Sequence, residues 1–228
     1  MHARDVMTSP VTTVLPTTPL VEIVDLMLKN RISAVPVVDA EGNLTGIVSE
    51  GDLMHRKDLG LPPEKSWWLR ALGGKVMLAE DFVEAHGATA EDLLTSNVIV
   101  VGEDARLPDI AGILERHHIK RVPVVSEGKV VGIVSRANLL QALSLHVADA
   151  SPTPSVSDRD IRDTILDVLQ HEKWANASHL NLVVRDGTAF LWGEVDNASQ
   201  RKALMVAVRE VPGVKDVVDH TRTLQTLY

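Results

Sequence analysis

Along the first two thirds of the chain, apolar and polar positions follow the same order of patterns twice. Short runs of β-branched and apolar residues alternate with stretches in which apolar residues recur every three or four positions. Short apolar runs predict strands, and a period near 3.6 predicts amphipathic helices. We expect β segments at 11–15 and 98–101, helices beginning near 20 and 107, and strands at 34–38, 44–48, 121–125 and 130–134. Thr18-Pro19 predicts a helix entry, with a hydroxyl cap and then Pro at the first helical position.

The two halves of this pattern are copies of one unit. Three blocks match in nearly one register: ARDVMTSPVTTV (3–14) with AEDLLTSNVIVV (90–101), ISAVPVV (32–38) with IKRVPVV (119–125), and GIVSEGDL (46–53) with GIVSRANL (132–139). Each copy is predicted to be a βαββα unit, spanning about 3–54 or 90–140. A unit this small cannot close its own core. We therefore expect the copies to bury their sheets against each other as a pseudo-twofold pair.

The unit resembles the CBS motif, and the pair resembles a Bateman module. The matching features are the apolar strand with a central Pro and the ending Gly-x-x-Ser-x-x-Asp/Asn-Leu, each present in both copies. The resemblance implies a non-catalytic regulatory protein that binds AMP, ADP, ATP or S-adenosylmethionine in the cleft between the motifs. It also implies a homodimer, because such pairs commonly associate face to face. We place motif 1 at 1–54, an insertion at 55–89 and motif 2 at 90–145.

The acid of the Gly-x-x-Ser-x-x-Asp pattern holds the ribose in CBS proteins, and the resemblance gives this role to Asp52. A carboxylate suits a diol because it accepts hydrogen bonds from two hydroxyls. Ser49 precedes it at a helix start, where backbone N–H groups favour anions. The same spacing predicts a capping box with no ligand, and the two roles are compatible. In the second copy Ser135 and Asn138 take these places, and an amide accepts through one oxygen only.

The strand around each Pro supplies the other predicted contacts. Pro favours an extended backbone before it and donates no hydrogen bond, which leaves nearby backbone groups for the edge of a base. The predicted positions are Ser33, Ala34, Val35 and Pro36 in the first copy, Lys120, Arg121, Val122 and Pro123 in the second, and Thr12. Lys120 and Arg121 match positions that contact phosphate in nucleotide-binding relatives of the family. The alternative is that this basic pair forms a solvated face.

The last third of the chain predicts a separate small domain. Residues 146–156 have a linker composition rich in small residues and Pro. A helix at 158–171, a hairpin around Asp186-Gly187, a helix at 198–211 and a strand at 214–221 follow. This αββαβ pattern, at 157–228, resembles the BON domain, which implies relay to an unidentified protein partner or contact with a membrane surface. The alternative function is a ligand-free interaction or scaffold protein, for which phospholipid binding through the BON-like domain is one option. The whole chain is predicted to be of mixed α+β and α/β class.

Composition narrows the function classes. The formal net charge of -8 and an aromatic content of 3% disfavour nucleic-acid binding. The chain has no Cys, and its His residues form no His-Glu-x-x-His frame, so we expect neither a metal site nor an enzyme. No segment has signal-peptide or membrane-span character, which makes the cytoplasm the expected location. Trp67 and Trp68 in the insertion predict a docking patch or a cover for the protein's own surface.

Overall fold

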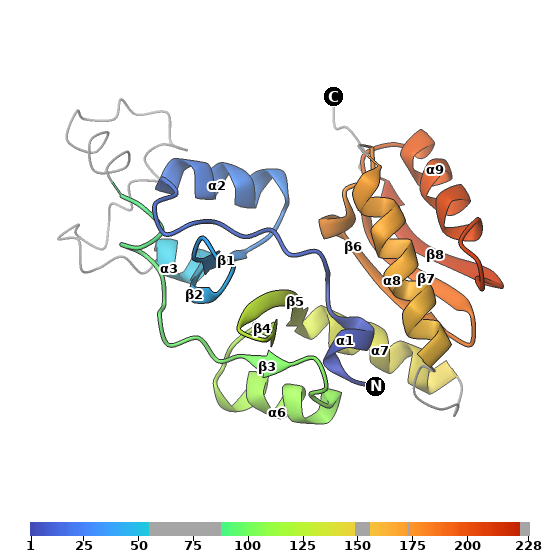
Figure 1. Ribbon diagram of the computed structural model, residues 1–228, viewed down its shortest axis with the longest axis horizontal. Helices are drawn as coiled ribbons and strands as arrows, with labels where there is room; N and C mark the ends of the chain where they lie inside the picture. The colour runs from blue at the N-terminus through green and yellow to red at the C-terminus, as the bar shows by residue number, and fades with distance from the viewer. Residues whose placement is uncertain (55–87, 149–155, 173, 224–228) are drawn as a thin grey trace. The chain divides into compact units, whose positions relative to one another are not determined.

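The computed structural model describes residues 1–54, 88–148, 156–172 and 174–223 (Figure 1). Most of the predicted insertion, with Trp67 and Trp68, and most of the predicted linker lie outside the described residues. The chain divides into two compact units. One is Thr12–Val98, and the other joins Met1–Val11 to Ile99–Tyr228.

The unit Thr12–Val98 holds the first repeat around an antiparallel hairpin. Its elements are α2 (Leu20–Lys29), β1 (Ala34–Val38), β2 (Leu44–Ser49) and α3 (Glu50–Met54). All of β1 is buried, and its first residue lies opposite the last residue of β2. α2 packs Leu20, Ile23 and Met27 into the core of this unit, with the spacing that predicted the helix. Both predicted strands are confirmed to within a residue.

The segment before α2 differs from the prediction in two ways. Only Val14 forms a bridge, parallel to Val37, so the predicted β segment at 11–15 is reduced to one position. α2 begins after Pro19, and Thr18 does not cap it. The Thr18 hydroxyl accepts a hydrogen bond from the Leu15 N–H at 3.0 Å instead. Because the Thr18 N–H also donates to Leu15 O at 3.0 Å, these two residues close a turn ahead of the helix.

The second repeat lies in the other unit and has the same plan. Its elements are α1 (Ala3–Val6), β3 (Val101–Gly102), α6 (Leu107–Arg116), β4 (Arg121–Ser126), β5 (Lys129–Ser135) and α7 (Arg136–Ala148). The sheet order is β3-β4-β5, with β3 parallel and β5 antiparallel to β4. Both hairpins carry a register shift at the same place, after Val37 and after Val124, so the copies share even their irregularity.

The C-terminal domain is a three-stranded sheet with two helices on one face (Figure 1). Its elements are α8 (Val156–His171), the short helix η2 (Ala177–His179), β6 (Leu180–Arg185), β7 (Thr188–Val195), α9 (Ala198–Arg209) and β8 (Asp216–Thr223). β6 and β7 are antiparallel, and β7 and β8 are parallel. Asp186 and Gly187 have φ angles of 52° and 79°, as the predicted tight turn requires. The αββαβ order is confirmed.

Each CBS-like repeat completes its core with the N-terminal segment of the other copy. The helix Ala3–Val6 begins the first copy in sequence, yet Ala3 and Val6 are buried in the core of the second repeat. Their counterparts, Ala90 and Leu93, are buried in the core of the first repeat. The sequence predicted neither this exchange nor the helix Ala3–Val6, which is too short to show a helical period.

Short β bridges hold each exchanged segment. Thr8 pairs with Ile133 and Thr95 pairs with Ile47, with N–H to O distances between 2.9 and 3.1 Å. In the second repeat Asn138 adds a further tie. Its Nδ2 donates to Val6 O at 3.0 Å and to the Thr8 hydroxyl at 3.2 Å.

Glycines make room for the exchanged side chains. A Cβ atom on Gly46 would lie 2.7 Å from Leu94 Cδ1 and 2.9 Å from Leu94 Cβ. A Cβ atom on Gly132 would overlap Met7, the counterpart of Leu94. These contacts are too close for any larger residue, so the two glycines permit the exchange.

Replacing Gly46 with Ala is expected to destabilise the first repeat by about 1–3 kcal/mol, because the added methyl group forces Leu94 out of its place. Gly102→Ala is the matched control, since it also adds a methyl group to a strand glycine but meets nothing within 4 Å. Urea unfolding of both variants measures the difference. Equal midpoints for the two variants would contradict the close packing.

Asn138→Asp is expected to lower the free energy of unfolding by about 1–3 kcal/mol at pH 7.5, because a carboxylate cannot donate to Val6 O. Burial raises the pKa of such an acid, so its destabilising effect grows as pH rises above the unfolded value near 3.9 and shrinks as pH falls towards 5. Asn138→Ala also loses the donor to Val6 O but introduces no titrating group, so it serves as the comparison. Thermal unfolding against pH should therefore separate the two variants, and parallel pH profiles would refute the assignment.

Candidate functional site

Asp52 lies at the start of α3, where the first repeat ends its hairpin. Its Oδ2 accepts hydrogen bonds from the Ser49 N–H at 2.7 Å and from the Ser49 hydroxyl at 2.6 Å. Its Oδ1 accepts one from the Thr95 hydroxyl at 3.1 Å. The side chain thus caps the helix and also binds the exchanged segment. The sequence singled out Ser49 and Asp52 but missed Thr95, although Thr95 stands in the repeated block.

Asn138 occupies the same place in the second repeat and is 3% exposed. Its Oδ1 accepts hydrogen bonds from the N–H and the hydroxyl of Ser135, and its Nδ2 makes the two donor contacts to the exchanged segment. An amide has two donors and one oxygen with two acceptor positions. Within the part of the chain that the structure describes, protein partners therefore fill the whole capacity of this side chain, and a ligand would have to displace one of them.

The two positions differ in what they can still accept. A carboxylate offers about four acceptor positions over its two oxygens. The described donors to Asp52 number three, and Oδ1 has only Thr95. Asp52 is half-buried, so one side of it reaches the surface. The first repeat therefore offers a negatively charged acceptor where the second offers a saturated amide.

At the start of each hairpin, sequence analysis predicted a pair of residues whose backbone groups read a base: Ala34 and Val35, or Arg121 and Val122. In each pair, the backbone N–H and C=O of one residue point away from the partner strand. The Glu50 N–H donates to Ser33 O at 3.0 Å. In an antiparallel ladder, residue pairs that exchange hydrogen bonds alternate with pairs that do not. Because Ser33 and Glu50 form a bonded pair, Val35 also bonds to β2, and the N–H and C=O of Ala34 point away from β2. The second repeat repeats this geometry, with Val122 in the ladder and Arg121 turned outward. Val35 and Val122 thus use their backbone groups within the hairpins.

The prolines fit this alternation. Pro36 and Pro123 stand opposite Ile47 and Ile133, at positions where the ladder needs no donor from them. Pro36 O accepts a hydrogen bond from the Val14 N–H at 3.1 Å on the outer edge of β1. The bridging segment runs parallel to β1, so Thr12, two residues earlier, lies towards the Ala34 end of this edge. The first repeat thus has Ser33, Ala34, Ser49 and Asp52 at one end of its hairpin, and Thr12 precedes the segment that bridges to β1.

The corresponding end of the second repeat is basic. Lys120 is exposed and Arg121 is half-buried, at the start of β4. Arg136, which sequence analysis did not single out, begins α7 beside them and donates from Nη2 to Ile119 O at 3.2 Å. Its counterpart in the first repeat is Glu50. The repeats therefore present opposite charge at equivalent places, which suits an anionic group near the second repeat and hydroxyl donors near the first.

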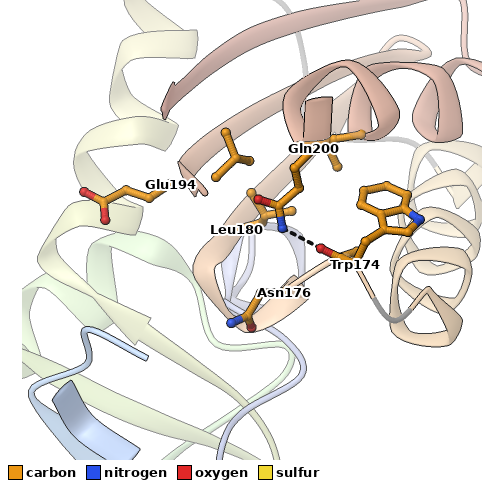
Figure 2. A pocket seen from close by; sticks show the side chains of 8 residues that line it. Trp174, Asn176, Leu180, Glu194 and Gln200 are labelled. Carbon is orange, nitrogen blue, oxygen red and sulfur yellow. Dashed lines mark hydrogen bonds between the residues drawn. The ribbon is translucent and has the colours of Figure 1, made fainter. Parts of the chain in front are cut away.

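Two hollows in the C-terminal domain do not suit a nucleotide. The hollow between Trp174 and Gln200, which are joined by a hydrogen bond, has a volume of about 10 Å³, room for a single water molecule (Figure 2). A wider open groove of about 610 Å³ is lined by Asp158, Asp160 and Asp186 against one cation, Lys215. Such a lining repels phosphate.

The described residues contain neither a metal-binding cluster nor a membrane-spanning helix. In the described ranges, His, Asp and Glu side chains form no group of three that could hold a metal ion. None of the helices that the structure describes combines the length and apolar character of a membrane span.

Two protein-family models match this chain, one in each of its parts. The CBS domain profile matches residues 3–58 and 90–145, and the BON domain profile matches residues 157–225. The uncharacterized protein MJ1426 of Methanocaldococcus jannaschii is 35% identical over 154 residues, which are 63% of this chain and 91% of that protein.

Solved structures agree with this match. The CBS domain of a CBS domain containing membrane protein from Sphaerobacter thermophilus has a TM-score of 0.51 and 34% identity, over 62% of this chain and 86% of that one. CBSX2 of Arabidopsis thaliana, in complex with AMP, has a TM-score of 0.50 and 26% identity, over 65% of this chain and 98% of that one. The chain therefore belongs to the CBS domain proteins, with tandem CBS domains followed by a C-terminal BON domain.

Proposed function

We propose that this protein is a non-catalytic regulator whose CBS domains bind an adenosyl ligand: AMP, ADP, ATP or S-adenosylmethionine. The observation that carries the proposal is the spare acceptor capacity of the half-buried Asp52 carboxylate, beside the outward backbone edge of Ala34. The similarity to CBSX2, whose structure contains AMP, supports the choice of ligand class.

Each repeat, taken by itself, supplies groups that match parts of such a ligand. Asp52 accepts hydrogen bonds from the ribose diol, and the N–H and C=O of Ala34 pair with the edge of the base. Lys120, Arg121 and Arg136 supply positive charge for phosphates. Asn138 has a structural role in this proposal, because its hydrogen-bonding capacity is used within the protein.

Ligand binding is proposed to act by a shift of population between two conformations. A ligand hydroxyl that donates to Asp52 Oδ1 shares that oxygen with the Thr95 hydroxyl, so the bound and free states differ in how tightly the exchanged segment is held. The BON domain then relays this change to a partner. This differs from catalysis in that the ligand leaves chemically unchanged.

The first prediction concerns Asp52. Titration calorimetry with AMP, ADP, ATP and S-adenosylmethionine should show binding of at least one of them to the full chain. Asp52→Asn should weaken the tightest ligand about tenfold or more, or ~1.4 kcal/mol, because a charge-assisted hydrogen bond to the ribose is lost. Asp25→Asn, which removes an exposed acid in the same repeat, is the charge-matched control. No heat from any of the four ligands with ligand-free protein would end the sensor proposal.

The second prediction concerns the basic group. Lys120→Ala and Arg136→Ala should each weaken AMP several-fold, by roughly 1 kcal/mol, and leave adenosine unchanged, because they act on phosphate alone. Lys129→Ala, at an exposed turn of the same hairpin, is the control. Equal losses for AMP and adenosine would show that the basic group does not contact phosphate.

Self-association is the third prediction. We expect a homodimer through the CBS domains, and exposed Leu140 and Leu143 on α7 supply an apolar surface for it. Sedimentation equilibrium should give twice the chain mass of 24.8 kDa, and Leu143→Glu should weaken the association. A monomeric mass at every protein concentration tested would contradict the homodimer.

A further inference from the structure

The BON domain uses the second face of its sheet as an internal contact surface. All six residues of β6 are buried. Leu182 and Val184 pack in the α8–α9 core, whereas Val183, which points to the opposite face, packs in the core of the second CBS repeat. Phe190 and Trp192 on β7 pack against that same core, and their rings stack with centroids 6.1 Å apart. The sheet thus lies between its own helices and the second repeat.

Two arginines of α8 hold the N-terminal segment of the chain. Arg159 Nε donates to Asp5 Oδ1 at 2.8 Å, and the Asp5 side chain is fully buried. Arg162 is 3% exposed and donates to Met7 O at 2.6 Å and to Leu182 O at 3.1 Å. The hydrogen bond with Asp5 raises the pKa of Arg159. A buried charge that loses its partner is strongly unfavourable. These contacts therefore stabilise the arrangement in which α8 packs against the N-terminal segment relative to one in which the two are apart.

Helix α7 supplies two more contacts to the same sheet face. Arg185 Nη1 donates to Leu145 O at 2.8 Å. Asn181 Nδ2 donates to Gln141 Oε1. Polar contacts therefore surround the apolar centre formed by Val183, as they do at stable interfaces between proteins.

The segment that the BON domain holds belongs in sequence to the first repeat. Beyond Met7 the chain leads directly to Thr12 and to Val14, whose N–H bonds to Pro36 O on the outer edge of β1. We propose that the BON domain is a fixed internal partner of the second CBS repeat and is coupled, through residues 3–14, to the edge of β1 in the first. The link to a ligand rests on the proposed function, whereas the docking and the coupling do not.

Chemical cross-linking tests the docking. The chain contains no cysteine, so an introduced pair reacts alone. Gln141→Cys with Asn181→Cys should be joined rapidly and within one chain by a short bis-maleimide, because the native side chains touch. Gln141→Cys with Ser199→Cys, on the exposed start of α9 beyond the opposite sheet face, is the control. Equal yields from the two pairs would overturn the docking.

Amide hydrogen exchange of the full chain, without ligand, tests the coupling. Arg162→Met should raise exchange about tenfold in residues 3–8, which lose the hydrogen bond at Met7 O, and also at Val14, because the chain that leads from Met7 to Val14 is then less restrained. Arg159→Met, which removes a less buried side chain, serves if the first variant does not fold. Arg201→Met is the matched control, because Arg201 pairs with Asp219 at 2.6 Å inside the BON domain. Faster exchange at 3–8 with no change at Val14 would overturn the coupling.

The two proposals fail separately. Absence of AMP binding to the wild-type chain counts against the proposed function only. If AMP binds, Arg162→Met should weaken it about fivefold or more, or ~1 kcal/mol, because the edge of β1 is less ordered before binding. If Arg162→Met raises amide exchange at Val14 but leaves the AMP affinity unchanged, the coupling to β1 does not affect ligand binding.

Discussion

The packing of Met7 against Gly132 and of Leu94 against Gly46 is the contact on which the rest of this structure depends. Neither CBS repeat closes its own core, and each takes the N-terminal segment of the other copy to do so. This exchange brings Thr95 to Asp52. It also presents the N-terminal segment to the BON domain. The proposed ligand site and the docked domain are therefore consequences of one packing arrangement.

Duplication followed by divergence explains the unequal repeats. The backbone plan is the same in both, down to the register shift in each hairpin. The side chains at equivalent positions differ: Asp52 and Glu50 in the first repeat correspond to Asn138 and Arg136 in the second. A buried amide with every hydrogen bond made stabilises its repeat, whereas a half-buried carboxylate with spare acceptor capacity is suited to binding. We infer that Asn138 stabilises the second repeat, whereas Asp52 at the equivalent position is left to bind a ligand.

Strands and helices of the repeats and of the BON domain could be predicted because apolar period and turn residues are local signals. The predicted strand at 34–38 has the bounds of β1, and Asp186-Gly187 forms the expected turn. The exchange of segments could not be predicted, since Ala3 and Ala90 are apolar in either arrangement and only packing decides between them. The roles of Arg159 and Arg162 could not be predicted either, because a single sequence does not distinguish a surface arginine from a buried one.

The most direct test of the central claim is a crystal structure of the full chain grown with AMP. The ribose hydroxyls should lie within hydrogen-bond distance of Asp52 and the base against the backbone of Ala34, with the exchanged segments still in place. A structure with AMP bound away from Asp52, or with Asp52 still held only by Ser49 and Thr95 at saturating AMP, would contradict it.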